Sequence, residues 1–173
     1  MANSIRTYAS HNLVVIHWLE GMQRAFDTMT TASIRHLPVV DDSGGIVGIL
    51  SDRDLQRAMQ IEQPDFNSGK IAQPSYDPGA RVRDHMSWPV RTIGEGCTLM
   101  EAAREMLDKR ISSLLVTKNS HVVGIVTTDD LLRALIDGSN SEGRLQELAD
   151  EARAAIYRSP VGQIAHALAN AGI

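Results

Sequence analysis

Ile-Val-Gly-Ile-Leu-Ser-Asp-Arg-Asp, at residues 46–54, is repeated later in this chain as Val-Val-Gly-Ile-Val-Thr-Thr-Asp-Asp, at residues 122–130. Both stretches place a hydroxyl residue after an apolar run that contains Gly-Ile, and an Asp three positions after the hydroxyl. Each copy continues as Leu-x-Arg-Ala, at residues 55–58 and 131–134. A long period that occurs twice indicates a duplicated unit, in which two copies can bury a face that one copy could not.

The composition is that of an ordinary globular protein. Of the 173 residues, 43% are hydrophobic and 22% are charged, and the net charge is −4, whereas a surface that binds nucleic acid is basic. The single cysteine excludes an internal disulfide and fits a reducing compartment. No signal-peptide pattern and no membrane-spanning apolar run is visible, so we expect a soluble, cytoplasmic protein that binds neither nucleic acid nor membrane.

The first copy predicts a repeat at residues 7–61 with the order strand, helix, strand, strand, helix. The expected strands are 13–16, 34–40 and 46–50, with turn residues at 41–45. A buried helical face is expected from apolar residues spaced i, i+3, i+4 and i+7, which are Met22, Ala25, Phe26 and Met29. Ser51 is expected to cap a closing helix that carries Leu55, Ala58, Met59 and Ile61.

A second repeat is predicted at residues 82–137, in the same order. Its expected strands are 90–93, 111–117 and 122–126, and its helical face is Leu99, Ala102, Ala103, Met106 and Leu107. Thr127 is expected to cap the last helix. The repeats differ in their second strand, where Pro38 matches Leu115. Because proline removes a ladder donor, we expect the strand with Pro38 to lie at a sheet edge or to begin irregularly.

Two segments fall outside the repeats. Residues 62–81 contain several prolines and glycines and are expected to be a linker. Residues 142–173 are expected to form a helical C-terminal tail, because apolar residues recur there at helical spacing.

The repeated Ser/Thr-x-x-Asp string has two interpretations. The hydroxyl and the carboxylate can cap the N-terminus of the helix that follows the strand, which explains both residue types without any ligand. Alternatively, the carboxylate accepts hydrogen bonds from ribose hydroxyls while the hydroxyl and nearby N–H groups face phosphate. Periodicity does not distinguish these two interpretations.

The strings at 34–41 (Ile-Arg-His-Leu-Pro-Val-Val-Asp), 48–54 and 124–130 resemble the signature of CBS domains, the tandem modules named after cystathionine β-synthase. The resemblance covers about residues 7–137. It implies an α/β (α+β) fold in which two β-α-β-β-α repeats pack as a pseudo-twofold pair, and two pairs commonly dimerise. It also implies an adenine nucleotide (AMP, ADP or ATP, with or without magnesium) between the repeats. NAD and S-adenosylmethionine rank below these.

Carried over by position, the resemblance implies two candidate nucleotide sites. The first consists of Arg35, His36, Ser51, Arg53, Asp54, Pro89, Val90, Ile111 and Ser112. The second consists of Thr7, Ser10, Asn12, Ile34, Arg35, Thr127 and Asp130. In the second repeat Ser112 and Ser113 match Arg35 and His36, and Asp129 matches Arg53. Because polyphosphates prefer cationic surroundings, we expect a nucleotide preferentially at Ser51 and Asp54.

Other chemistry finds little support in the sequence. The six histidines show no His-x-x-x-His spacing and Cys97 has no cysteine partner, so we expect no protein-ligated metal. No glycine-rich phosphate loop is present, and no nucleophile, base and oxyanion set can be named. We therefore expect a homodimeric regulatory module without catalysis, which acts on a protein partner that the sequence does not identify. The alternative is a purely structural interaction module whose motifs only cap helices.

Overall fold

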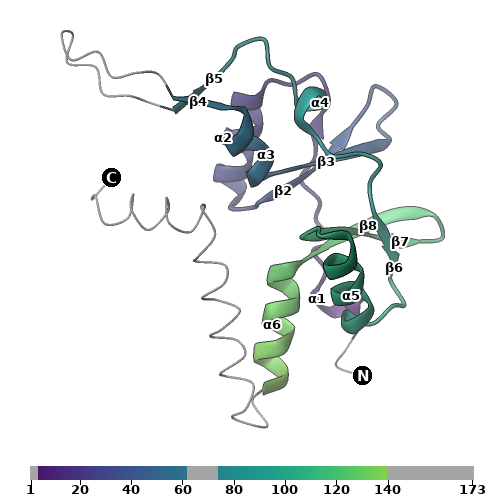
Figure 1. Cartoon of the computed structure of the whole chain (residues 1–173). Helices are drawn as coiled ribbons and strands as arrows, with labels where there is room; N and C mark the ends of the chain where they lie inside the picture. The colour runs from purple at the N-terminus through teal and green to yellow at the C-terminus, as the bar shows by residue number, and fades with distance from the viewer. Residues whose placement is uncertain (1–3, 62–73, 140–173) are drawn as a thin grey trace. The chain divides into compact units, whose positions relative to one another are not determined.

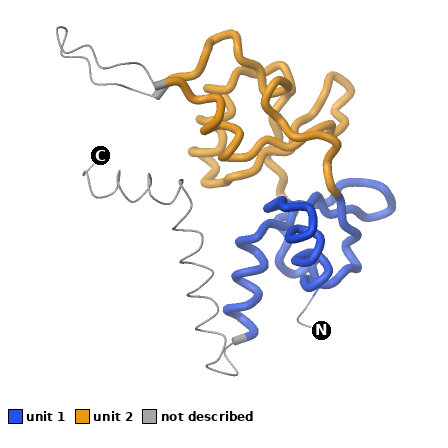
Figure 2. Tube along the Cα trace, viewed as in Figure 1, with its two compact units in different colours: residues 1–11, 92–173 blue, residues 12–91 orange. Residues whose placement is uncertain are grey.

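The computed structural model describes residues 4–61 and 74–139. The chain divides into two compact units, which Figure 2 shows in different colours. Unit 1 consists of residues 1–11 and 92–173, and unit 2 consists of residues 12–91. The second repeat therefore folds together with the N-terminal segment, while the segment that precedes the second repeat folds with the first.

Unit 2 contains a three-stranded sheet of order β1-β2-β3. Its strands are β1 (Ile16–His17), β2 (His36–Val40) and β3 (Ile46–Ser51), with β1 parallel and β3 antiparallel to β2. Helices α2 (Met22–Ala32) and α3 (Asp52–Ala58) pack on this sheet (Figure 1). The core joins both helices to the strands and comprises Ile16, Met22, Ala25, Met29, Leu37, Val39, Leu50, Leu55 and Val82.

Unit 1 repeats this arrangement. Its sheet has the order β6-β7-β8, formed by β6 (Thr92–Gly94), β7 (Ser113–Lys118) and β8 (His121–Thr127). Its helices are α1 (Ile5–Tyr8), α5 (Leu99–Lys109) and α6 (Thr128–Ser139). The core of unit 1 comprises Ile5, Ala9, Leu99, Ala102, Met106, Leu114, Val116 and Val126. The predicted mixed helix–strand class and the two repeats of five elements are thus confirmed.

The end of the first repeat differs from the prediction. Helix α3 ends at Ala58, and Met59 begins a strand, β4 (Met59–Ile61), instead of continuing the helix. This strand pairs antiparallel with β5 (Pro74–Tyr76), so the last part of the predicted linker is ordered. Residues 62–73 of the linker, and the tail from residue 140 onward, lie outside the described residues.

Two apolar residues lie less deeply than their helical spacing predicts. Phe26 is partly exposed on α2, where its ring contacts the ring of Tyr76 with 6.0 Å between centroids. Leu107 on α5 is 77% exposed. Both stand at the border of the buried face, where spacing alone does not determine burial.

The expectation that the strand with Pro38 lies at a sheet edge is wrong, because β2 is the central strand of its sheet. Pro38 pairs with Ile49, whose own N–H and C=O bond to Ser87 on the other side of β3. The missing N–H of Pro38 therefore faces β1, which pairs only with Val39 and Val40 and does not reach Pro38. In unit 1 the first strand is longer and does reach the matching residue, Leu115.

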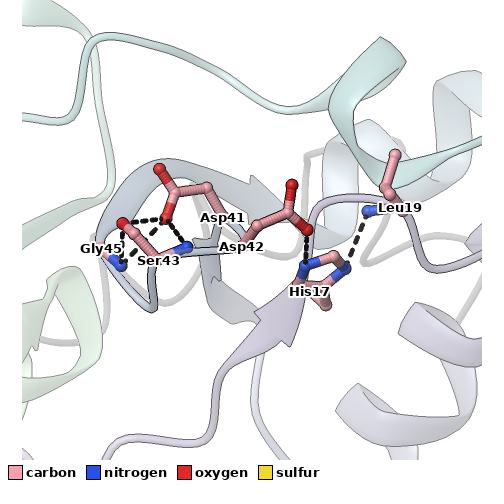
Figure 3. Close-up of polar contacts among 6 residues, drawn as sticks. All are labelled: His17, Leu19, Asp41, Asp42, Ser43 and Gly45. Atoms are coloured by element: carbon pink, nitrogen blue, oxygen red, sulfur yellow. Dashed lines mark hydrogen bonds and ion pairs between the residues drawn. The ribbon is translucent and has the colours of Figure 1, made fainter.

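The turn between β2 and β3 is built around one carboxylate, as Figure 3 shows. Asp41 Oδ1 accepts hydrogen bonds from the Ser43 N–H (2.9 Å), the Ser43 hydroxyl (2.6 Å) and the Gly45 N–H (3.1 Å). These bonds, the Ser43 hydroxyl first, lower the pKa of Asp41 below its ordinary value. Gly44 has a φ of 78°, a conformation that glycine adopts without strain. The predicted hairpin turn at 41–45 is confirmed.

We call residues 4–11 and 82–91 the crossing segments, because each precedes the first strand of one repeat but belongs to the unit that contains the other repeat. Each attaches to a sheet edge by the same pair of backbone hydrogen bonds. In unit 1 the Ser10 N–H donates to the Ile125 carbonyl (2.9 Å) and the Ile125 N–H donates to the Ser10 carbonyl (3.0 Å). In unit 2 Ser87 and Ile49 exchange the equivalent bonds at 2.9 and 3.0 Å. Each segment thus extends a three-stranded sheet at β8 or β3.

A glycine stands beside each attachment. A Cβ on Gly124 would lie 2.8 Å from the Ser10 carbonyl oxygen, which is backbone. A Cβ on Gly48 would clash with the Sδ of Met86, near the end of a flexible side chain. The repeated Gly-Ile therefore marks where the crossing segment approaches the strand too closely for a side chain.

This difference predicts unequal responses to the same substitution. Gly124→Ala forces backbone apart and should lower the free energy of unfolding by about 1–3 kcal/mol. Gly48→Ala displaces a methionine that can change rotamer, so we expect a smaller loss. Urea unfolding of both variants measures the two losses. An equal loss, or a larger one for Gly48→Ala, would contradict this account of unit 1.

His11 fastens the N-terminal segment to unit 1. Its Nδ1 lies 3.0 Å from the Val123 carbonyl oxygen and its Nε2 lies 3.1 Å from the Arg6 carbonyl oxygen. A carbonyl only accepts, so both contacts become hydrogen bonds when the ring carries two protons. The carbonyls of Arg6 and then Val123 raise the pKa of His11, helped by Glu95 and opposed by desolvation and the charge of Arg6.

His11 should therefore make stability depend on pH. Its folded pKa is raised above the ordinary 6.5, so its contribution is complete below that value and is lost as pH rises through the folded pKa. We expect the difference in urea midpoint between the wild type and His11→Gln to shrink between about pH 6 and about pH 9. A difference that stays constant over this range would show that the contacts do not require the protonated ring.

Candidate functional site

The Ser51–Asp54 string forms a complete capping box at the start of α3. Asp54 Oδ2 accepts hydrogen bonds from the Ser51 backbone N–H at 2.8 Å and from the Ser51 hydroxyl at 2.6 Å. The Asp54 N–H donates to the Ser51 hydroxyl oxygen at 3.4 Å. The predicted cap at Ser51 is confirmed.

The carboxylate of the Thr127–Asp130 string accepts the matching hydrogen bonds at the start of α6. Asp130 Oδ2 accepts from the Thr127 N–H at 2.8 Å and from the Thr127 hydroxyl at 2.7 Å. In both units the next backbone N–H also binds across to the residue that precedes the middle strand. The Asp52 N–H donates to the Arg35 carbonyl and the Thr128 N–H donates to the Ser112 carbonyl, both at 3.0 Å.

Both carboxylates are almost completely buried, with Asp54 5% and Asp130 4% exposed. A buried carboxylate is costly unless it is hydrogen-bonded and paired with positive charge. The hydroxyl and N–H of the cap satisfy one oxygen of each carboxylate, and an arginine one turn along the helix contacts the other. These arginines are Arg57 for Asp54 and Arg133 for Asp130.

The structure brings part of the first candidate site together within unit 2. Arg35 and His36 lie beside Ser51, because the Arg35 carbonyl binds the start of α3 and His36 pairs with Ser51 across β2 and β3. Pro89 and Val90 follow Ser87, which pairs with Ile49 on the same β3 strand. Arg53 is exposed in the first turn of α3. The other two residues, Ile111 and Ser112, belong to unit 1.

The second candidate site is likewise divided by unit. Thr127, Asp130 and Ser10 belong to unit 1, where Ser10 pairs with Ile125 two residues before Thr127. Thr7 lies on α1, which packs against α6. The remaining residues, Asn12, Ile34 and Arg35, belong to unit 2.

Three residues at or close to these strand–helix junctions are absent from the sequence-based site lists. Arg57 and Arg133 contact the two carboxylates, and their signal is the Leu-x-Arg-Ala that follows both copies. Ser87 holds the position in unit 2 that Ser10 holds in unit 1. Its signal is its place 77 residues after Ser10, the offset that relates the first parts of the two repeats.

Among residues 4–61 and 74–139, no group of three or more His, Cys, Asp or Glu side chains is arranged to hold a metal ion. Within the same part of the chain, no helix is long and apolar enough to cross a membrane.

Comparison with known proteins identifies the family. Residues 5–61 and 82–137 each match the family model of the CBS domain. The two matches cover more than half of the chain. This chain therefore belongs to the CBS domain family, as the repeated strings predict.

Individual relatives agree with this assignment. A CBS domain-containing protein of Dictyostelium discoideum, DDB_G0289609, is 29% identical over 134 residues, which are 76% of this chain and 90% of that protein. A homoserine O-acetyltransferase of Methanosphaera stadtmanae is 29% identical over 125 residues, which are 72% of this chain and 22% of that enzyme. The similarity to the enzyme thus covers about a fifth of its length and does not carry its activity to this chain.

A solved structure with the same fold contains ligands. The CBS domain pair of protein MJ0100, in complex with 5′-methylthioadenosine and S-adenosyl-L-methionine, superimposes with a TM-score of 0.62 at 25% sequence identity. The superposition covers 79% of this chain and 97% of that one.

Proposed function

We propose that this protein is a regulatory module that binds an adenosine-containing ligand and performs no chemistry on it. The observation that carries the proposal is the pair of buried carboxylates at matching strand–helix junctions, in a family whose member MJ0100 holds two adenosine compounds in its domain pair. A carboxylate accepts hydrogen bonds from ribose hydroxyls, and the adjacent Ser51 or Thr127 can serve the ligand as well as the helix.

The proposed ligand is an adenine nucleotide (AMP, ADP or ATP), and the preferred site is the one around Ser51 and Asp54. Arg53 precedes Asp54 in the chain and the Arg35 carbonyl binds the Asp52 N–H, whereas Asp129 and Ser112 hold the matching positions in the second repeat. Phosphate is favoured by guanidinium groups and disfavoured by an additional carboxylate. A triphosphate would bring magnesium with it, which a comparison of binding with and without the ion tests.

The regulatory step would be a shift between two conformations of the protein. A ligand changes their populations only if it binds one more tightly than the other, and a protein partner then reads the difference. We also propose that the partner binds a surface that differs between the two conformations, and that the protein is cytoplasmic.

The competing function is a structural interaction module whose repeated motifs only cap helices. The capping box at Ser51 and the matching hydrogen bonds at Thr127 favour it, since these contacts give both motifs a structural use. The two functions differ in what the carboxylate contributes. A cap contributes to stability alone, whereas a binding group also contributes to affinity.

Asp54→Asn is the substitution that separates them. It removes the charge and keeps the shape, so we expect a loss in unfolding free energy of about 1 kcal/mol from the weakened cap. In the wild type, AMP, ADP or ATP at about a hundred times its dissociation constant should add about 2.7 kcal/mol to stability, seen as a higher unfolding temperature. We expect Asp54→Asn to lose most of this gain.

Asp130→Asn is the matched control, because it weakens an equivalent cap in the other repeat. It should reduce the nucleotide-induced gain less than Asp54→Asn does. If none of these nucleotides, nor NAD or S-adenosylmethionine, raises the unfolding temperature of the wild type, the binding proposal fails and the structural module remains. Equal reduction by both variants would contradict the preference for the first site.

The proposal includes a homodimer, which predicts a sedimentation mass of twice the 18.9 kDa chain. Helix α5 exposes the apolar side chains of Met100 and Leu107, which lie two turns apart on one side of the helix, and we propose this side as part of the dimer contact. We expect Leu107→Asp to shift the protein toward a single chain, because the new charge would be buried in a contact. A wild type that sediments as one chain at all concentrations would remove the dimer from the proposal.

A further inference from the structure

The second part of the repeated string, Leu-x-Arg-Ala, has no role in the function proposed above. Its arginine stands one helical turn after each buried carboxylate. Arg57 Nη2 lies 2.6 Å from Asp54 Oδ1, and Arg133 Nη1 lies 3.3 Å from Asp130 Oδ1. The arginine side chains are 74% and 71% exposed. Each buried carboxylate is therefore paired with a cation that is mostly in water.

The hydrogen bonds around Asp54 leave little room for a sugar. A carboxylate offers about four lone-pair positions, two on each oxygen. Within the described part of the chain, Oδ2 already accepts from the Ser51 N–H and hydroxyl, and Oδ1 accepts from Arg57. One position remains on Oδ1. Two ribose hydroxyls cannot both donate to Asp54 while the cap and Arg57 stay in place.

Arg57 is the partner that can leave. The contacts from Ser51 form the cap of α3, whereas the guanidinium lies largely in water and can exchange this contact for hydration at little loss. We propose that Arg57 is a gate that occupies the ribose position of Asp54 when the site is empty and is displaced when a ribose binds. Arg133 acts in the same way on Asp130. This inference rests on the proposed function.

The gate gives binding a consequence at the surface. Displacement frees a guanidinium on the exposed side of α3, one turn from the buried carboxylate. An acidic group of a partner would pair with it more strongly in the ligand-bound state, because the guanidinium then no longer shares its charge with Asp54. The shorter contact at Asp54 than at Asp130 indicates that the gate holds more tightly in unit 2.

The test is isothermal titration calorimetry of the full chain with adenosine and with 2′-deoxyadenosine. Neither nucleoside carries a phosphate, so a change in affinity cannot come from a contact between arginine and phosphate. Without Arg57 the ribose has no competitor, so Arg57→Gln should bind adenosine about two- to fivefold more tightly, the range expected for loss of an ion pair whose cation is mostly in water. 2′-Deoxyadenosine offers one hydroxyl fewer and fits the remaining position. Its affinity should change less, so the preference for ribose should increase.

Three controls make the result specific. Arg24→Gln removes the same charge from the exposed side of α2 in the same unit and should leave the ribose preference unchanged. Arg133→Gln should have a smaller effect than Arg57→Gln. Arg57→Ala, which keeps a high helix propensity, is a second way to remove the guanidinium if Arg57→Gln unfolds at a lower temperature than the wild type.

The outcomes separate the gate from the function on which it rests. Weaker adenosine binding by Arg57→Gln would show that Arg57 contacts the ligand. An unchanged preference for ribose would show that Arg57 does not compete with the ribose. Either result overturns the gate and leaves the proposed nucleotide binding in place. Absence of adenosine binding by the wild type and the variants would overturn the gate. If AMP, ADP, ATP, NAD and S-adenosylmethionine also leave the unfolding temperature of the wild type unchanged, the proposed function falls with it.

Discussion

Asp54 and Asp130 each bring a negative charge into a place where almost no water reaches. A charge in that position is tolerated only if the protein supplies hydrogen-bond donors around it, and here these come from the strand end and from the second turn of the helix. The carboxylate therefore fixes the helix to the strand. The local geometry of both repeats depends on this single requirement, and the residues that meet it are those that the two copies share.

The second constraint is the close approach of the crossing segments. Ser10 and Ser87 pair with residues two positions before Thr127 and Ser51, on the same strands that lead to the carboxylates. A glycine on each strand makes room for them. Each unit is thus completed by a segment that precedes the other repeat in the sequence, and that segment pairs with the strand that leads to the carboxylate. This is why Ser10 and the residues after Ser87 belong near the candidate sites.

Much of the fold could be predicted because the same pattern is written twice. The caps, the hairpin turn at 41–45 and the order of elements all follow from local residue types. The exceptions depend on non-local partners. Met59 continues into a strand because β5 pairs with it, and the proline in β2 is tolerated because β1 stops short of it. Neither the partner strand nor its length is visible in the residues concerned.

The candidate site was predictable in part. Ser51, Asp54 and their equivalents could be found because a hydroxyl and a carboxylate at this spacing have a defined use. Arg57 and Arg133 were visible as a repeat, but their role depends on which oxygen of the carboxylate they contact. Which unit contributes Thr7, Ser10, Pro89 and Val90 depends on the exchange of segments, which has no local signal.

The most direct measurement of the central claim is a crystal structure of the full chain with AMP at saturating concentration. The account predicts that the ribose hydroxyls donate to the carboxylate of Asp54, with Ser51 still in contact with Oδ2. Bound AMP whose ribose contacts neither Asp54 nor Asp130 would contradict it, and these carboxylates would then be helix caps alone.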